Sequence, residues 1–414
     1  MKVAIMATSN EDRFKSRKTK YLHEVIDKPL IAYSIEQAKS FSPEIVVVGR
    51  ENNELKTVVE GLGAQFVEEG AAAGFFAAFG DQPVLIFEAD DIWMLQRPYP
   101  PSSHDEINRL VRLHKMSGVP TYIRDDHHSG TFYLPLGSGR GENIPMPWDS
   151  APFVAAAKHF APLPQVLKAH PNAEPYHLPH YYPQRVFSLW DISHVVGNIS
   201  GANIANLAAE GVVFQSMHSV TIGADVTIEA DAVIYSNVEI TGKTHIGSGT
   251  IIRSGTRIHN MTIGAGCEIE QSVLLDSTIG DGTSVGPFAY IRPGSRIGSN
   301  CRIGDFVEVK NSTIGDSSKA SHLGYIGDSI IGSNVNFGCG SITVNYDGAN
   351  KSATVIEDGV FVGSNSNLVA PVRLGENSFV AAGSTVTRDV PPGDLAVGRS
   401  RQENKSGWKR PFKK

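Results

Sequence analysis

The sequence predicts two domains, an α/β domain with a parallel sheet followed by a parallel β-helix built from six-residue repeats. Apolar runs alternate with amphipathic stretches from Met1 to about Leu95, a pattern typical of successive β-α-β units. Aliphatic residues then recur at every sixth position from about Val220 to Val390. The chain has 414 residues, which is more than one hydrophobic core usually serves.

In the first region we expect buried strands at "KVAIMA", "EIVVVG" and "QPVLIFEAD", with helices between them. Ligands on such sheets gather beyond the carboxyl ends of the strands. A ligand site is therefore expected around Ala7 to Arg13 and around Glu88 to Asp91.

The region from Gln96 to about Ser193 has a weaker pattern, with a helix expected at "HDEINRLVRLHKMSG" and a strand at "VPTYIRD". Several histidines follow, including the pair in "DDHHSG". No two of them have the i, i+4 helical spacing with a third ligand in view. We interpret them as solvated loop residues, and what this region binds is left open.

The second domain is defined by its six-residue period, which fits neither a helix nor a hairpin and indicates a hexapeptide parallel β-helix. Three six-residue sides make a coil of about eighteen residues, and coils stack at roughly 4.7–4.9 Å. Burying each aliphatic side chain contributes about 1.5–3 kcal/mol. The inward positions form three runs, interrupted by slips in register: Ile222, Ile228, Ile234, Ile240, Ile246, Ile252 and Ile258; Ile279, Val285, Ile291, Ile297, Ile303 and Val309; Ile356, Val362, Leu368, Leu374, Val380 and Val386.

Polar residues interrupt the repeat in one region. Arg292 and Lys310 are eighteen residues apart, so their like charges stack and require carboxylates or a bound anion nearby. With Lys351 in the non-repeating loop "TVNYDGANKSAT", they favour a phosphate site. His322 and Tyr325 lie in the same region, and a neutral imidazole near pH 7 can accept a proton.

Composition excludes several classes of partner. The net charge of −6 gives no reason to expect a nucleic acid or a membrane surface as the main partner. The three cysteines are far apart, which favours neither a disulfide framework nor a zinc site and suggests a reduced, cytoplasmic location. No apolar run is long enough for a signal peptide or a membrane span.

Five segments in the second half resemble the carboxy-terminal domain of the GlmU family: "FVEVKNSTIGDSSKASHLGYIGD", "NYDGANK", "FVGSNSNLVAPV", "AAGSTVTRDV" and "GWKRPFKK". This family comprises bifunctional N-acetylglucosamine-1-phosphate uridyltransferases and glucosamine-1-phosphate N-acetyltransferases of UDP-N-acetylglucosamine biosynthesis, which supplies peptidoglycan and lipopolysaccharide. The resemblance runs from about Val220 to the last residue. It implies a left-handed β-helix, a homotrimer with active sites between subunits, and acetyl transfer from acetyl-CoA to glucosamine 1-phosphate.

The resemblance also implies roles for individual residues. His322 corresponds to the general base. The sugar-phosphate site corresponds to Arg292, Lys310, Tyr325, Asn336 and Lys351. The acetyl-CoA site corresponds to Cys339, Asn345, Tyr346, Ser364, Ala382 and Arg399. Cys339 stands where family members usually have alanine, and its use as an acyl-accepting nucleophile is the alternative to direct attack by the amine.

A weaker resemblance to the family's nucleotidyltransferase domain covers about the first ninety residues. It implies nucleotide binding by Arg13 and Lys20, and magnesium ligation by Asp90 and Asn198. The family's glycine-rich loop is replaced by "SNED", which puts carboxylates where a triphosphate would lie.

We therefore expect a Rossmann-like nucleotidyltransferase-type domain with degenerate motifs over residues 1–197, a linker over 198–219, a β-helix acetyltransferase domain over 220–390 and a basic tail over 391–414. The main expectation is an acetyl-CoA-dependent glucosamine-1-phosphate N-acetyltransferase. One alternative is a bifunctional enzyme that also uses UTP and magnesium. The other is a non-catalytic assembly module.

Overall fold

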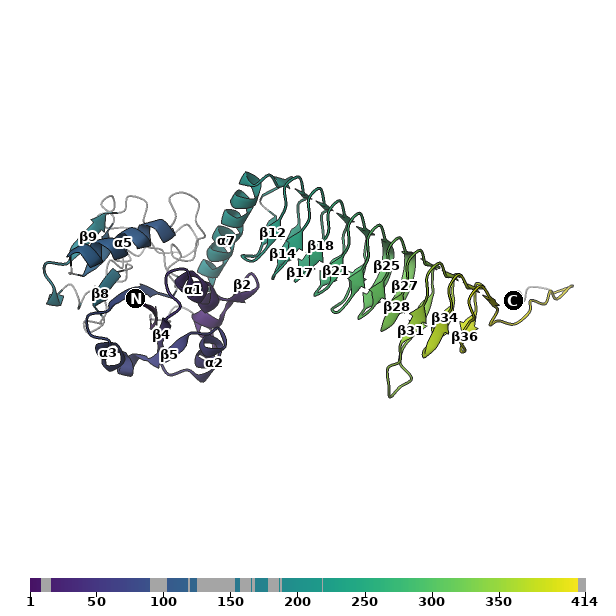
Figure 1. The fold of residues 1–414 in the computed structure, drawn as a ribbon, viewed down its shortest axis with the longest axis horizontal. Coiled ribbons are helices and arrows are strands. Elements are labelled where there is room, and N and C mark those ends of the chain that lie inside the picture. Colours follow the sequence, from purple (N-terminus) through teal and green to yellow (C-terminus); the bar gives the residue numbers. More distant parts are fainter. Residues whose placement is uncertain are drawn as a thin grey trace, which may run out of the picture. The chain divides into compact units, whose positions relative to one another are not determined.

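The computed structural model consists of two compact units, Met1–Asn206 and Leu207–Lys414 (Figure 1). Each unit is described by itself below. The structure describes residues 1–8, 16–89, 103–117, 120–124, 153–156, 165, 168–177, 186, 188–217 and 219–408.

The first unit contains a seven-stranded sheet in the order β5-β4-β1-β6-β8-β7-β9. The strands that the first region contributes to this sheet are parallel, as the sequence predicts: β1 pairs with β4 and β6, and β4 with β5. Farther along the sheet, β8 runs antiparallel to both β6 and β7. The strands are β1 (Lys2–Ala7), β4 (Ile45–Gly49), β5 (Gln65–Glu68), β6 (Pro83–Glu88), β7 (Thr121–Arg124), β8 (Phe153–Ala156) and β9 (Glu174–His177).

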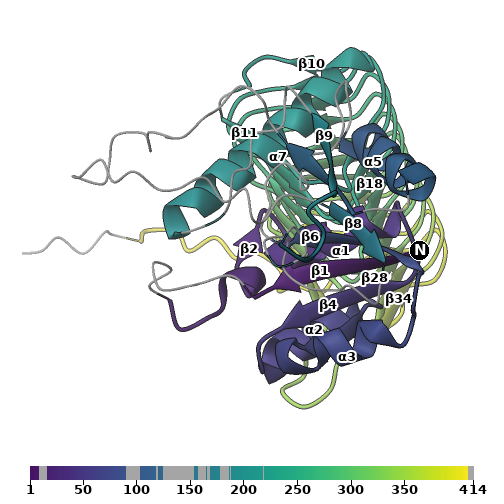
Figure 2. The same ribbon diagram turned by 90° about the vertical axis from the view of Figure 1, so that its left-hand side faces the viewer.

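Described helices lie between successive strands from β1 to β7 (β1, β4, β5, β6 and β7), which confirms the α/β class (Figure 2). The expected helix and strand of the weaker region are present as α5 and β7. The final helix, α7, extends to Ala209, so it includes part of the segment expected to be a linker. The helical elements are η1 (Lys20–Leu22), α1 (Leu30–Lys39), α2 (Asn53–Gly61), α3 (Glu69–Ala77), α5 (Ser103–Ser117) and α7 (Leu189–Ala209), and a small ribbon is formed by β2 (Glu24–Val25) and β3 (Lys28–Pro29).

The second unit is a left-handed parallel β-helix with a triangular cross-section, as expected. Its first face consists of β10 (Val213–Phe214), β13 (Val233–Ile234), β16 (Ile251–Ile252), β19 (Glu268–Ile269), β22 (Ser284–Val285), the first parts of β25 (Arg302–Lys310) and β27 (Lys319–Gly327), β29 (Asn336–Phe337), β32 (Phe361–Val362), β35 (Phe379–Val380) and β37 (Leu395–Ala396).

The second face continues β25 and β27 around a bend. Its other strands are β11 (Val220–Ile222), β14 (Val238–Thr241), β17 (Arg257–His259), β20 (Val273–Leu275), β23 (Tyr290–Ile291), β30 (Ile342–Val344), β33 (Asn367–Val369) and β36 (Thr385–Val386). The third face consists of β12 (Thr227–Ile228), β15 (His245–Ile246), β18 (Thr262–Ile263), β21 (Thr278–Ile279), β24 (Arg296–Ile297), β26 (Thr313–Ile314), β28 (Ser329–Ile331), β31 (Thr354–Ile356) and β34 (Val372–Leu374).

The core of the β-helix confirms the six-residue pattern. Every aliphatic residue of the three predicted runs is buried, with at most 5% of its surface exposed. The slips in register are sides shortened to five residues, as between Ile258 and Ile263 and between Val309 and Ile314, which are all buried. A longer interruption separates Thr343 from Ile356, where a loop projects beside β31 (Figure 1).

Candidate functional site

A column of residues occupies the same bend, between the first and second faces, in successive coils. Asp305 pairs in register with His322 between β25 and β27. In the later coils, the backbone N–H groups of Gly340, Asn365 and Gly383 each donate to the preceding coil, at 2.6, 2.8 and 2.8 Å. These bonds place four residues implied by the resemblance, together with one that was not, along one edge. We call this edge the bend column: Asp305, His322, Cys339, Ser364 and Ala382.

The bend depends on backbone conformations that side chains with a Cβ rarely adopt. Phe306 and Leu323, which follow Asp305 and His322, have φ angles of 58° and 34°, and Gly340 has 73° in the next coil. These left-handed conformations turn the chain from one face to the next. The bend therefore places the preceding side chain of each coil on the same edge.

His322 is held by a hydrogen bond to the coil below. Its Nδ1 lies 2.7 Å from Asp305 Oδ1, and the side chains are 57% and 39% exposed, respectively. The hydrogen bond to His322 lowers the pKa of the Asp305 carboxyl, so at neutral pH this carboxylate can only accept. Nδ1 therefore carries the proton and donates it, which leaves Nε2 of a neutral ring as the proton acceptor.

The predicted cations are stacked in adjacent coils of the second face, where Ile291 pairs with Val309. Each of the two cations is paired with a carboxylate. Arg292 Nη1 lies 2.7 Å from Glu308 Oε1, and Lys310 Nζ lies 3.7 Å from Asp328 Oδ2.

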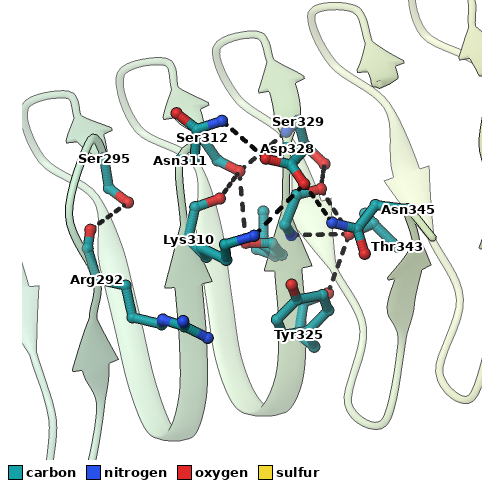
Figure 3. A network of polar contacts seen from close by, with 12 residues as sticks. Arg292, Ser295, Lys310, Asn311, Ser312, Tyr325, Asp328, Ser329, Thr343 and Asn345 are labelled. Atoms are coloured by element: carbon teal, nitrogen blue, oxygen red, sulfur yellow. Dashed lines mark hydrogen bonds and ion pairs between the residues drawn. The ribbon is translucent and has the colours of Figure 1, made fainter. Parts of the chain in front are cut away.

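Asp328 is the centre of a polar network (Figure 3). Asn311 Nδ2 donates to its Oδ1 at 2.7 Å, and Asn345 Nδ2 donates to its Oδ2 at 2.5 Å. Burial alone would raise the pKa of Asp328, but these hydrogen bonds and the charges of Lys310 and Lys351 outweigh burial and lower that pKa. The network links a loop residue, Asn345, to Lys310, one of the two stacked cations.

Tyr325 is on β27, three residues after His322 and three before Asp328. It pairs in register with Glu308 on one side and Ile342 on the other. Its ring covers Gly327, where an added Cβ would lie 2.4 Å from the phenol oxygen. A side chain at position 327 would therefore displace the tyrosine.

The loop that carries Tyr346 and Lys351 folds back on itself, since these two residues form an isolated antiparallel bridge. Asp347 accepts hydrogen bonds from the N–H groups of Ala349 and Asn350 at 2.8 and 2.6 Å. Tyr346 is 56% exposed. The loop thus presents an aromatic ring and a cation from a locally ordered turn.

Two implied residues lie outside these groups. Asn336 is on the first face, where it pairs with Lys319 and Phe361. Arg399 lies in the tail, with its Cδ 3.7 Å from the position a Cβ on Gly383 would take. Arg399 is therefore near the far end of the bend column.

In the α/β unit, only some of the residues implied by the resemblance lie in the described part of the chain. Arg13 and Asp90 lie outside the described residues, as do the "SNED" loop and the "DDHHSG" histidines. Lys20 is 1% exposed, and its Nζ donates to the Val186 carbonyl at 2.9 Å. Asn198 is half-buried in α7. Among the described residues, no three acidic, histidine or cysteine side chains form a metal-binding group.

A cavity of about 200 Å³ nevertheless opens where β1 and β4 end. This is the edge of the sheet at which the sequence predicts a ligand. The cavity is lined by Ala7, Thr19, Tyr21, Arg50, Glu51, Asn52 and Leu55.

Sequence reasoning missed the carboxylate partners Asp305, Glu308 and Asp328. The separations between these carboxylates and their partners are 17, 16 and 18 residues. Because coils differ in length, no single spacing identifies such pairs, although acidic residues near one coil length from each candidate cation or base are a usable signal.

The fold and the repeat define a hexapeptide-repeat β-helix protein. Residues 276–311 and 353–388 match the family model described as "Bacterial transferase hexapeptide (six repeats)". In the described part of the chain, no helix combines the length and the apolar character that a bilayer span requires.

Within that class, the chain is similar to proteins named Bifunctional protein GlmU. It is 57% identical over 149 residues to that of Clostridium botulinum (strain ATCC 19397 / Type A) and 60% identical over 149 residues to that of Alkaliphilus metalliredigens (strain QYMF). Each match covers 36% of this chain and 33% of the relative. The resemblance to the GlmU family is thus confirmed, and the chain covers about a third of the length of these relatives.

Among solved structures, a UTP-bound UGPase from Acinetobacter baumannii matches with 13% sequence identity and a TM-score of 0.35, covering 50% of this chain and 98% of that one. The α/β class of the first unit rests on its own strand order and helices.

Proposed function

We propose that this protein is an acyltransferase that moves the acetyl group of acetyl-CoA to the amine of glucosamine 1-phosphate. The observation that carries the proposal is the hydrogen bond between His322 Nδ1 and Asp305, which leaves Nε2 as the proton acceptor, in the unit that also carries the stacked cations Arg292 and Lys310. The similarity to GlmU proteins over about a third of the chain supports it.

The reaction needs a base because a sugar ammonium cannot attack until it loses a proton. His322 Nε2 takes that proton, and the amine nitrogen then attacks the thioester carbonyl carbon. The carbon–sulfur bond breaks, the thiolate leaves with the proton held by His322, and the amide nitrogen releases its second proton to solvent. Position and orientation of the two substrates supply much of the rate, so no covalent enzyme intermediate is required.

The phosphate would bind at Arg292, Lys310 and Lys351. In this structure Arg292 and Glu308 form an ion pair with side chains that are 38% and 36% exposed. Exposed pairs of this kind contribute only about 0.2–1 kcal/mol. A phosphate dianion can therefore draw the guanidinium away from Glu308 at small cost, and charge-assisted bonds to the phosphate are stronger.

We also propose that the active protein is a homotrimer. Exposed aromatic rings support this: Phe361 and Phe379 stack at 4.4 Å between ring centroids and are 39% and 43% exposed on the first face. Covering such rings by another copy would bury apolar surface. Light scattering should give three times the 44.6 kDa chain mass.

The α/β unit supports a second candidate function, uridyl transfer from UTP with magnesium. The cavity beyond β1 and β4 lies where nucleotides bind on such sheets. A UTP-dependent assay on N-acetylglucosamine 1-phosphate tests this function, and Asp90→Ala should abolish the product.

The decisive experiment for acetyl transfer measures thiol release from acetyl-CoA with glucosamine 1-phosphate. The wild type should release thiol and form N-acetylglucosamine 1-phosphate. His322→Ala should reduce turnover by roughly 10²–10⁴-fold and change sugar affinity far less. Turnover in His322→Ala equal to that of an active wild type would remove His322 as the base, and no turnover in either protein would leave the assembly-module alternative.

A further inference from the structure

Asp305 lies next to His322 in the structure, although the two residues are well separated in the sequence. It is 17 residues before His322 and pairs with it in register on the preceding coil. Asp305 Oδ1 and His322 Nδ1 are 2.7 Å apart, a distance within the range of strong charge-assisted hydrogen bonds.

The residues that precede Asp305 and His322 allow the backbones of the two coils to approach closely. Gly304 precedes Asp305, and Ser321 precedes His322. A Cβ on Gly304 would lie 1.9 Å from the Ser321 carbonyl oxygen, so only glycine permits this approach. The left-handed residues that follow, Phe306 and Leu323, turn both coils at the same place. The contact between Asp305 and His322 is therefore built into the bend.

The carboxylate has few competing partners. Its pKa is lowered first by the hydrogen bond to His322 and by its own backbone N–H, with a smaller effect from the charge of Arg302. An ionised carboxylate oriented toward Nδ1 selects the tautomer with the proton on that nitrogen.

We propose that Asp305 is the positioning residue of the acetyl transfer, holding the His322 ring so that Nε2 is the unprotonated nitrogen and stabilising the imidazolium that forms. The inference rests on the proposed function. Nε2 takes the ammonium proton before the amine attacks. It gives that proton to the departing thiolate as the carbon–sulfur bond breaks, and the new amide nitrogen releases its second proton to solvent. Asp305 gains no proton in these steps and touches neither substrate.

The experiment compares Asp305→Ala and Asp305→Asn with Asp281→Asn in the full chain. Asp281 is a matched control because its carboxylate accepts a backbone N–H from the adjacent coil at 2.8 Å, at a different edge of the same unit. One readout is steady-state kinetics with both substrates. The other is ¹⁵N spectroscopy of labelled histidine, in which His322→Gln identifies the His322 signals.

We expect Asp305→Ala to lower kcat roughly 10–100-fold with both KM values within about threefold. The His322 signals should change from a protonated Nδ1 to a mixture of tautomers. Asp305→Asn retains an oxygen acceptor and should lie between Asp305→Ala and the wild type, and Asp281→Asn should match the wild type.

His322 signals that are unchanged in Asp305→Ala would overturn the proposal. So would a fall in kcat/KM that arises from KM alone. A wild type that transfers no acetyl group would refute the proposed function instead, and the ¹⁵N spectra, which need no turnover, would still decide whether Asp305 fixes the imidazole.

Discussion

The two units bury their apolar side chains in different ways. In the α/β unit, one cluster joins residues far apart in sequence, such as Val3, Leu85 and Ala155. In the β-helix, each inward residue packs on its counterparts one coil away, as Ile291 does on Leu274 and Val309. Energy in a stacked repeat is approximately a sum of nearest-neighbour terms. Damage should therefore spread through the first unit and stay local in the second.

Truncation of a core residue in each unit is expected to give the largest effect. Leu85 and Ile291 are both 0% exposed, so Leu85→Ala and Ile291→Ala should each cost about 2–5 kcal/mol of unfolding free energy. Hydrogen exchange by mass spectrometry reports each unit separately. Faster exchange should cover the α/β sheet in the first variant but only the neighbouring coils in the second.

The exposed Ile330, at 57%, supplies the control, since Ile330→Ala should change exchange little. Faster exchange over the whole β-helix in Ile291→Ala would show that its coils unfold together. The contrast between the two units would then fail.

The next largest effect concerns the stacked cations, for which the α/β unit offers no counterpart among its described residues. Lys310→Ala should raise the KM for glucosamine 1-phosphate roughly 10–100-fold, because a charge-assisted bond to phosphate is worth about 1.5–3 kcal/mol. The KM for acetyl-CoA should stay within about threefold. Steady-state kinetics with each substrate varied in turn provides the measurement.

Lys243→Ala is the control for this variant, since Lys243 lies in an early coil and outside the proposed site. An equal rise in both KM values for Lys310→Ala would indicate a disturbed fold rather than a lost phosphate contact. No change in either value would remove Lys310 from the sugar-phosphate site.

The same difference between the units explains what the sequence could predict. In a repeat, the same spacing of buried residues recurs in every coil. The inward residues between Ile222 and Val386 could therefore be assigned to the core from their spacing alone. The α/β strands were also predictable, because β1, β4 and β6 are continuous apolar runs. The antiparallel strand β8 was not, since "FVAA" is a short apolar segment without a turn signal that fixes its direction.

The site was predictable as a set of residue types but not as a set of partners. Stacking of Arg292 on Lys310 follows from an eighteen-residue coil, and the bend column collects His322, Cys339, Ser364 and Ala382. Which carboxylates pair with these groups depends on which coils have a side shortened by one residue. That loss is set by local backbone conformations such as the left-handed Asn311 and Asp328, which no periodic rule specifies.

We expect the stability of the β-helix to depend on pH through the carboxyl group of Asp328. Its folded-state pKa is below its ordinary value of about 3.9, so its stabilising contribution is complete above about pH 4 and is lost as pH falls through the folded-state pKa. Asp328→Asn should cost roughly 2 kcal/mol at pH 7, because two hydrogen bonds to a charged acceptor are weakened. Denaturant unfolding at several pH values should show the difference from the wild type narrowing below about pH 4.

A difference that stays constant down to pH 2 would mean that the Asp328 charge contributes nothing. The variant Asp316→Asn is the control for a coil aspartate whose carboxylate accepts from a backbone N–H, that of Ser299 at 2.7 Å, instead of side-chain amides. Its loss should be smaller, because one bond is affected and the acceptor is exposed.

The smallest effect expected belongs to a local hydrogen bond in the α/β unit. Asn52 caps α2, accepting the Leu55 N–H at 2.9 Å through its side-chain oxygen, and loss of such a cap costs about 1 kcal/mol. Because Leu55 belongs to the shared core cluster, Asn52→Ala should still raise exchange in β4 and β5 as well as in α2. Asn52→Asp, which keeps the acceptor, should restore protection. If Asn52→Ala loosened only the first turn of α2, the α/β core would respond to damage as locally as the coils of the β-helix, and the distinction between the two units would lie in their geometry and not in their cooperativity.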